Sequence, residues 1–170
     1  MKAWHFCKGE RLRDGQTLTK GKTYEYQGKL ELCYSGLHAS LKILDALRYA
    51  PGNTICRVEC SGHILESFDK LVCSKRKVLW YIEGEKILRK FARLCALDVA
   101  HLWKPSELVL EYLKTGKESL REDARKESAS AFTYAASAAT AASSAAAEKM
   151  TQEKHETRLR RLIYKERKTK

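Results

Sequence analysis

The run of residues 30–62 constrains the fold most, because it sets a turn and a short helix between two stretches of alternating residues. Apolar and polar residues alternate over 30–34, which predicts a half-buried strand ended by the turn pair Ser35-Gly36. Ser40 is a suitable N-cap for a helix whose apolar residues recur at spacings of three and four. We therefore expect a strand, a turn and a helix in succession.

Pro51 marks the expected end of this helix. Proline disfavours helical geometry in the residue before it, and the Gly-Asn pair that follows is typical of a turn. Residues 54–60 then alternate again, with Cys56, Val58 and Cys60 on one face. The chain is therefore expected to reverse at Pro51 and to return as a second strand.

Other short segments complete a sheet and its covering helices. Period-two alternation predicts further strands at 3–6, 24–26, 71–73 and 78–82. The spacing becomes helical over 85–103, and a shorter helical pattern ends at Gly116, a natural C-terminal cap. We therefore predict an α+β fold with a small mixed or split β-sheet, packing helices and a long C-terminal alanine-rich helix.

The last third of the chain has a different composition. Residues 117–170 contain no Gly or Pro, and Ala and Ser dominate 129–147, which predicts one long helix. We predict an α+β domain at 1–116 and a helical extension with a basic end at 117–170. An Ala/Ser surface buries little apolar area, so we expect only weak self-association through this helix. For the same reason, we expect that the extension can be removed without unfolding the domain.

The net charge of +12, from 33 Lys and Arg against 21 Asp and Glu, favours an acidic partner. Nucleic acid or an acidic protein surface would be attracted to it, and the alternative is a basic surface without a ligand. We expect one basic cluster in a loop beside Trp80 and Tyr81, and a second near the C-terminus. The candidate binding residues are Lys75, Arg76, Lys77, Arg158, Arg160 and Arg161.

The sequence shows no run of 18 apolar residues and no charged-then-apolar N-terminal segment. We therefore expect a cytoplasmic protein without a membrane partner. The six cysteines are then expected to be reduced thiols. They contain no CxxC pair, and the histidines are scattered, so we expect no metal site.

His38 lies between the turn and the helix start, where free backbone N–H groups can converge on an anion. The alternative is that its imidazole braces the helix. We expect His5, on the first strand, and His38 to line one cleft.

The segments KAWHFC, CYSGLHAS, DALRYAPG and FARLCALDVAHLW resemble a family of small proteins carried by bacteriophages and prophages. The similarity covers roughly residues 2–163 and implies a phage or prophage origin, and hence the host cell cytoplasm. No activity of that family can be carried over. On this basis we expect a phage accessory protein that binds host or defence machinery, or nucleic acid, through its basic surface and without a cofactor.

A more distant resemblance suggests an alternative. The segments at 3–5, 36–39, 46–49 and 58–62 are similar in order to the strand and helix motifs of ADP-ribosyltransferases. The resemblance implies NAD as the cofactor, with His5 bonded to its ribose and His38 replacing a stacking tyrosine. Glu83 would be the catalytic glutamate. We therefore keep an NAD-dependent transferase as the competing hypothesis.

Overall fold

The computed structural model describes residues 1–128 and 145–169, so most of the alanine-rich segment predicted at 129–147 lies outside the described residues. The chain forms two compact units, one of residues 1–85 with 159–170 and one of residues 86–158. The boundary that we predicted after Gly116 falls inside the second unit. Each unit is described by itself.

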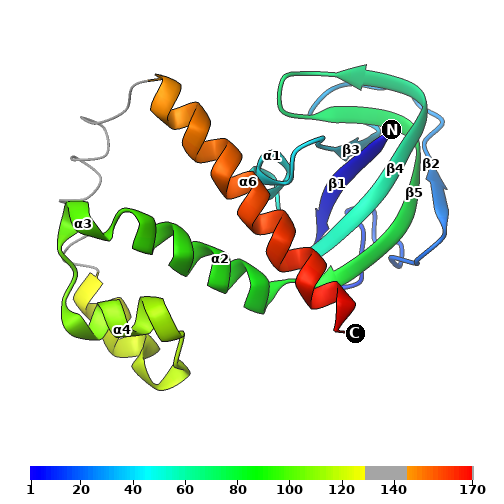
Figure 1. Ribbon diagram of the computed structural model, residues 1–170. Coiled ribbons are helices and arrows are strands. Elements are labelled where there is room, and N and C mark those ends of the chain that lie inside the picture. The colour runs from blue at the N-terminus through cyan, green and yellow to red at the C-terminus, as the bar shows by residue number, and fades with distance from the viewer. Residues whose placement is uncertain (129–144, 170) are drawn as a thin grey trace. The chain divides into compact units, whose positions relative to one another are not determined.

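A five-stranded antiparallel sheet forms the first unit, and the predicted α+β class is confirmed. Its strand order is β1-β4-β5-β2, and β3 pairs with the remaining part of β5 (Figure 1). Every paired strand runs antiparallel to its neighbour. The strands are β1 (Lys2–Cys7), β2 (Thr23–Glu25), β3 (Leu37–Ala39), β4 (Thr54–Glu66) and β5 (Leu71–Glu83).

The sheet curls until its two sides meet. Trp4 on β1 donates its N–H to the carbonyl of Ser40, just after β3, at 2.8 Å, and the reciprocal bond is 2.9 Å. Two irregularities of register in β4, at Arg57/Val58 and between Ser61 and Ile64, are the kind of bulge that bends and twists a strand. The sheet therefore encloses an inner face.

Small and sulfur-containing side chains fill this inner face. Cys56, Val58 and Cys60 are all fully buried there, which confirms the predicted alternation of β4. The Sγ atoms of Cys7 and Cys56 lie 3.7 Å apart, and all six cysteines are free thiols. Free cysteine packs as a small hydrophobe in such a core.

The C-terminal end of α6 (Ala145–Lys168) belongs to the sheet unit from residue 159 onward. Leu159 and Ile163 are fully buried. The Tyr164 ring packs edge-to-face against Trp4 and Trp80, with ring centroids 6.3 and 6.0 Å apart. This packing argues against our expectation that the extension can be removed without unfolding the domain.

Three local predictions in this unit are wrong. Residues 30–34 form no strand but lead into a tight turn, in which the N–H of Ser35 donates to the carbonyl of Glu31 at 2.9 Å. The loop predicted at 74–77 is the middle of β5. The helix α1 (Ile43–Arg48) begins after Lys42, because the backbone of Ser40 is used to close the sheet.

The second unit is helical. The helix predicted over 85–103 is interrupted after Asp98. A later helix begins after the N-cap Ser106, whose side chain accepts the N–H of Val109, and it ends at Gly116 as predicted, with a φ of 69°. Buried Val109 and Leu113 pack with Ala124. Its elements are α2 (Glu85–Asp98), α3 (Ala100–Trp103), α4 (Glu107–Thr115), the 3₁₀ turn η1 (Glu118–Leu120), a helical segment at 121–128 and the first part of α6.

One carboxylate organises the charges of this unit. Arg158 donates two hydrogen bonds to Asp98, at 2.8 and 3.1 Å, and the Lys154 ammonium lies 3.1 Å from the same group. These partners lower the pKa of Asp98 to about 2, with the hydrogen bond from Arg158 as the largest cause. Within the described residues, no helix has the length and apolar character needed to cross a membrane.

Candidate functional site

His5 lies on the inner face of the sheet. Its register partner on β4 is the buried Cys56, and its imidazole makes a hydrogen bond to the backbone of His38. Burial lowers the pKa of His5 well below its usual value, and the nearby charges of Arg76 and His38 lower it further. His5 is therefore a neutral, hydrogen-bonded histidine near neutral pH.

The His38 ring lies on the outer side of β3, away from the inner face that carries His5. Its neighbours in the strand, Leu37 and Ala39, pack into the inner core, so the alternation of the strand turns His38 outward. Its Nε2 accepts the backbone N–H of Cys33 at 3.0 Å, and the ring also bonds the backbone of Gly36. Burial is the largest cause that lowers the pKa of His38. The imidazole therefore braces the turn that precedes it.

Glu83 lies at the exposed end of β5, where its Oε1 accepts the N–H of Glu85 at 2.8 Å at the start of α2. No hydrogen bond in the described part of the chain joins Glu83 to His5 or His38. The structure thus brings His5 to the backbone of His38, turns the two rings to opposite faces and gives Glu83 a capping role. This arrangement does not favour the NAD-dependent alternative.

The basic residues of β5 alternate rather than cluster. Lys75 is exposed and lies 3.0 Å from Glu25, and Lys77 is exposed. Arg76 points inward and is only 4% exposed, and its Nη1 donates to the His38 carbonyl at 2.6 Å. This buried guanidinium holds β3 against β5 and is unavailable to a large partner.

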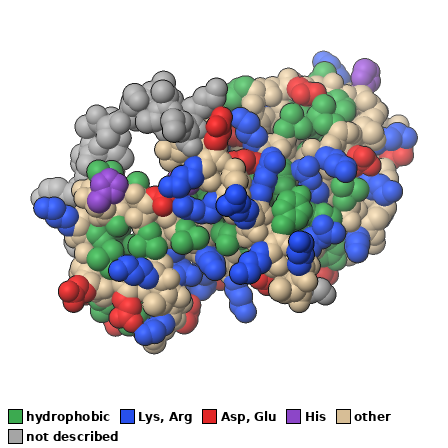
Figure 2. Space-filling model, viewed as in Figure 1, with side chains coloured by type: hydrophobic (Ala, Val, Ile, Leu, Met, Phe, Trp, Pro, Cys, Tyr) green, Lys and Arg blue, Asp and Glu red, His purple; other side chains and the backbone are tan. Residues whose placement is uncertain are grey.

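The end of α6 adds exposed positive charge to the sheet unit. Residues 1–85 and 159–170 together contain 20 Lys and Arg against 11 Asp and Glu, a net charge of +9, which leaves +3 for residues 86–158. Arg160 and Arg161 are exposed on this helix end, whereas Arg158 is held by Asp98. Lys and Arg also outnumber Asp and Glu on the face drawn in Figure 2.

Three cations near the C-terminal end of α6 share one side of the helix. Arg161, Lys165 and Lys168 follow one another at spacings of four and three residues, and all are exposed. None of them has an ion pair with another described residue. Tyr164, between them in sequence, is held against two tryptophans, so the cations project from an anchored helix. We call Arg161, Lys165 and Lys168 the basic stripe.

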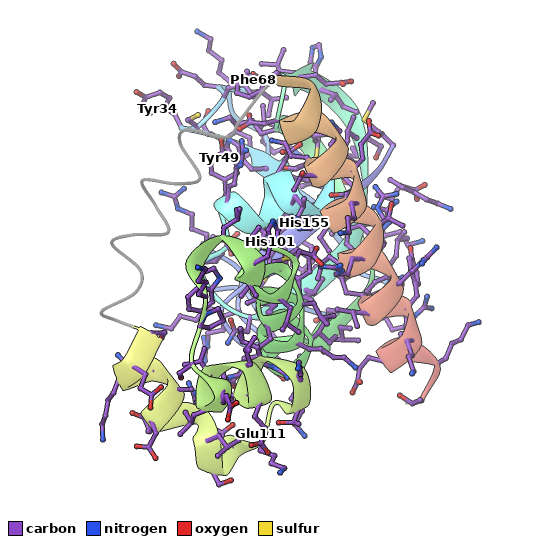
Figure 3. All side chains as sticks on the ribbon, turned by 60° about the vertical axis from the view of Figure 1, so that its left-hand side comes forward. Tyr34, Tyr49, Phe68, His101, Glu111 and His155 are labelled. Atoms are coloured by element: carbon purple, nitrogen blue, oxygen red, sulfur yellow. The ribbon has the colours of Figure 1, made fainter. Side chains whose placement is uncertain are left out.

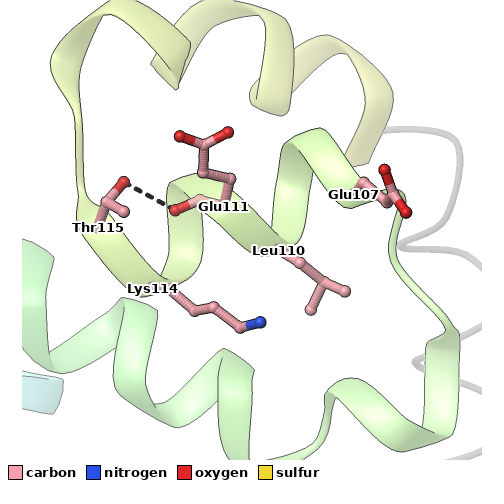
Figure 4. A pocket seen from close by; sticks show the side chains of 5 residues that line it. All are labelled: Glu107, Leu110, Glu111, Lys114 and Thr115. Carbon is pink, nitrogen blue, oxygen red and sulfur yellow. Dashed lines mark hydrogen bonds between the residues drawn. The ribbon is translucent and has the colours of Figure 1, made fainter.

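A surface depression on α4 offers no convergent chemistry. Its lining side chains come from one helix, and the hydroxyl of Thr115 donates to a backbone carbonyl of that helix at 2.8 Å (Figure 4). In residues 1–128 and 145–169, no three His, Cys, Asp or Glu side chains are grouped to hold a metal ion. The lining residues are Glu107, Leu110, Glu111, Lys114 and Thr115.

Sequence reasoning missed a group of exposed aromatic residues in the sheet unit. Tyr34, Tyr49 and Phe68 are 80%, 51% and 89% exposed, and Figure 3 labels all three toward the same end of this unit. The Lys70 ammonium lies between two of their loops, 4.4 Å from the Tyr49 ring centroid and 3.2 Å from Cys33 Sγ. We call Tyr34, Tyr49, Phe68 and Lys70 the aromatic surface.

The fold and these surfaces define a small α+β protein with a curled antiparallel sheet and a basic helix end. A family model described as "Domain of unknown function (DUF7666)" matches residues 1–90, and the chain belongs to this family. The matched residues contain all five strands. Neither the curated proteins nor the solved structures contain a match to the chain.

Proposed function

We propose that this protein binds nucleic acid through the basic surface of its sheet unit, centred on the basic stripe. The observation that carries the proposal is the anchoring of the helix end, which holds on one side of a helix three exposed cations that have no carboxylate partner among the described residues. A net charge of +9 on this unit attracts a polyanion over a longer range.

The spacing of the stripe suits a phosphate backbone. With a helical rise of about 1.5 Å per residue, neighbouring cations of the stripe lie roughly 4.5–6 Å apart along the axis. Successive phosphates of an extended strand have a similar separation, so each cation can approach a different phosphate. Such contacts carry no base information, and we expect binding with little sequence preference.

The test compares two triple variants that change the net charge equally. In the first, Arg161, Lys165 and Lys168 are replaced by Gln. In the second, Lys117, Arg121 and Lys126 of the helical unit are replaced by Gln. Each of these three cations already has a carboxylate partner.

Affinity for a fluorescein-labelled oligonucleotide is measured by anisotropy at constant low salt. We expect the stripe variant to bind at least about tenfold more weakly, since lost phosphate contacts remove favourable counterion release. The matched variant should stay close to wild type. Equal losses in the two variants, or no binding by the wild-type protein, would contradict the proposal.

The binding of an acidic protein of the host or of its defence machinery is the other reading of the same surface. It predicts that the wild-type protein has no measurable affinity for the oligonucleotide even at low salt. The anisotropy measurement therefore separates the two kinds of partner.

A further inference from the structure

Two aromatic side chains stand out from the packing of the sheet unit. Trp4, Phe6 and Tyr24 are almost fully buried, as aromatic residues in a small domain usually are, whereas Tyr34 and Phe68 leave most of their rings in solvent. Exposed aromatic groups that lie together mark interaction surfaces more often than single exposed residues do.

The loop that carries Phe68 is held in place by hydrogen bonds of the residues on either side of Phe68. The N–H of Ser67 donates to the carbonyl of Lys70 at 2.8 Å and closes the turn between β4 and β5. Asp69 is 5% exposed, and its Oδ2 accepts the Tyr49 hydroxyl at 2.5 Å. Phe68 therefore projects from a turn that is tied to the end of α1.

The loop that carries Tyr34 is equally constrained. The N–H of Tyr34 donates to the carbonyl of Glu31 at 3.1 Å, and Cys33 adopts a left-handed conformation with a φ of 72°. The bond from the Cys33 N–H to His38 fixes this conformation, and the Lys70 ammonium donates to the Cys33 thiol. Lys70 thus links the two loops, and their backbones have little freedom left to lose on binding.

We propose that the aromatic surface stacks the unpaired bases of a single-stranded nucleic acid that the positive charge of the sheet unit attracts; this inference rests on the proposed function. Exposed aromatic rings beside cations are the recurring arrangement in proteins that bind single strands without sequence preference. A duplex offers its base faces only at its ends, so the aromatic surface adds affinity for single strands alone.

The positive charge of the unit favours this ligand over a protein partner. The sheet unit has a net charge of +9, and the charges of Arg13 and Lys70 are among the causes that lower the pKa of His38. If this surface binds a protein instead, the affinity of the chain for single strands should not depend on the rings of Tyr34 and Phe68. The test below measures that dependence.

The test uses the full chain with Tyr34 and Phe68 both replaced by Ala, and compares a single-stranded 15-mer with the duplex of the same sequence. Stacking contributes about 1–3 kcal/mol for each base. We therefore expect the affinity for the single strand to fall at least about tenfold, while the affinity for the duplex stays within about twofold of wild type. Both side chains are exposed, so thermal unfolding should remain as in the wild-type protein.

Two controls sharpen the result. Tyr34→Phe keeps a ring of the same size, so this variant should retain most of the single-strand affinity that Tyr34→Ala loses. Leu102→Ala removes an exposed apolar side chain from the other unit and should have no effect.

The outcomes separate this inference from the proposed function. If the double alanine variant keeps wild-type affinity for the single strand, or loses affinity for the duplex to the same extent, the aromatic surface does not stack bases. The proposed function still stands in that case if the basic-stripe variant alone loses affinity. If the wild-type protein binds neither oligonucleotide, both fail.

Discussion

Ile163→Ala tests whether the C-terminal helix is an integral part of the sheet unit. The Ile163 side chain is fully buried on α6, one residue before the Tyr164 ring that contacts two tryptophans. Truncation of a fully buried isoleucine to alanine removes its transfer free energy and leaves a cavity, which together cost about 2–5 kcal/mol. We expect the free energy of unfolding to fall by about 3 kcal/mol.

Urea unfolding followed by tryptophan fluorescence measures this change, because Trp4 and Trp80 lie in the affected packing. For a chain of this size, a loss of about 3 kcal/mol corresponds to a melting temperature lower by roughly 6–12 °C. Lys165→Ala, on the exposed side of the same helix, is the control and should stay within about 0.5 kcal/mol of wild type.

A change of less than about 0.5 kcal/mol for Ile163→Ala would refute the packing of α6 on the sheet. The extension would then be removable, as the alanine-rich composition first predicts. With the packing described here, a chain that ends at Gly116 should lose its cooperative unfolding transition instead.

Three further changes report on single interactions. Asp98→Asn should reduce the free energy of unfolding, measured by urea titration, by about 1–2 kcal/mol near pH 6. Because the pKa of Asp98 is lowered to about 2 in the folded protein, this difference from wild type should shrink as the pH falls below roughly 4. The pKa of His5 is lowered in the folded state, so on acidification the unfolded chain takes up a proton at His5 before the folded chain does. The free energy of unfolding should therefore decline as the pH falls below roughly 6.5, and His5→Asn should flatten that decline. Ser106→Ala removes the N-cap of α4 and should cost about 1 kcal/mol in thermal unfolding, whereas Ser106→Thr keeps a hydroxyl that can accept from Val109 and donate to Glu127, and should retain most of the stability.

Part of the sheet could be predicted from alternation, since buried and more exposed residues alternate over 56–61 of β4 and 75–83 of β5. In β1 both faces are buried, because only His5 of residues 3–7 keeps partial exposure. The same rule failed over residues 30–34, because a tight turn also brings alternate side chains to different sides. It failed at 74–77 because the inward-pointing residue, Arg76, is charged like its exposed neighbours Lys75 and Lys77, so no apolar residue marks the buried face of the strand. Closure of the sheet through Trp4 and Ser40 joins residues far apart in sequence, which no local pattern indicates.

The candidate sites show a similar limit. Residue type suggested that His38 either joins a cleft or braces a neighbouring element, and the structure favours bracing, because the ring bonds the backbone of both Cys33 and Gly36 in the preceding turn. Tyr34 and Phe68 could not be separated from core aromatics by sequence, since only the anchored turns expose them. The origin in a phage or prophage and the likeness to ADP-ribosyltransferases stay predictions.

The salt dependence of nucleic-acid binding tests the central claim most directly. The logarithm of the association constant is measured against the logarithm of the salt concentration, for wild type and for the triple Gln variant of Arg161, Lys165 and Lys168. Each phosphate contact contributes about 0.7–0.9 to the slope, so loss of the basic stripe should make the slope shallower by about 2–3. A slope that is the same in both proteins, or a wild-type affinity that does not change with salt, would contradict the account.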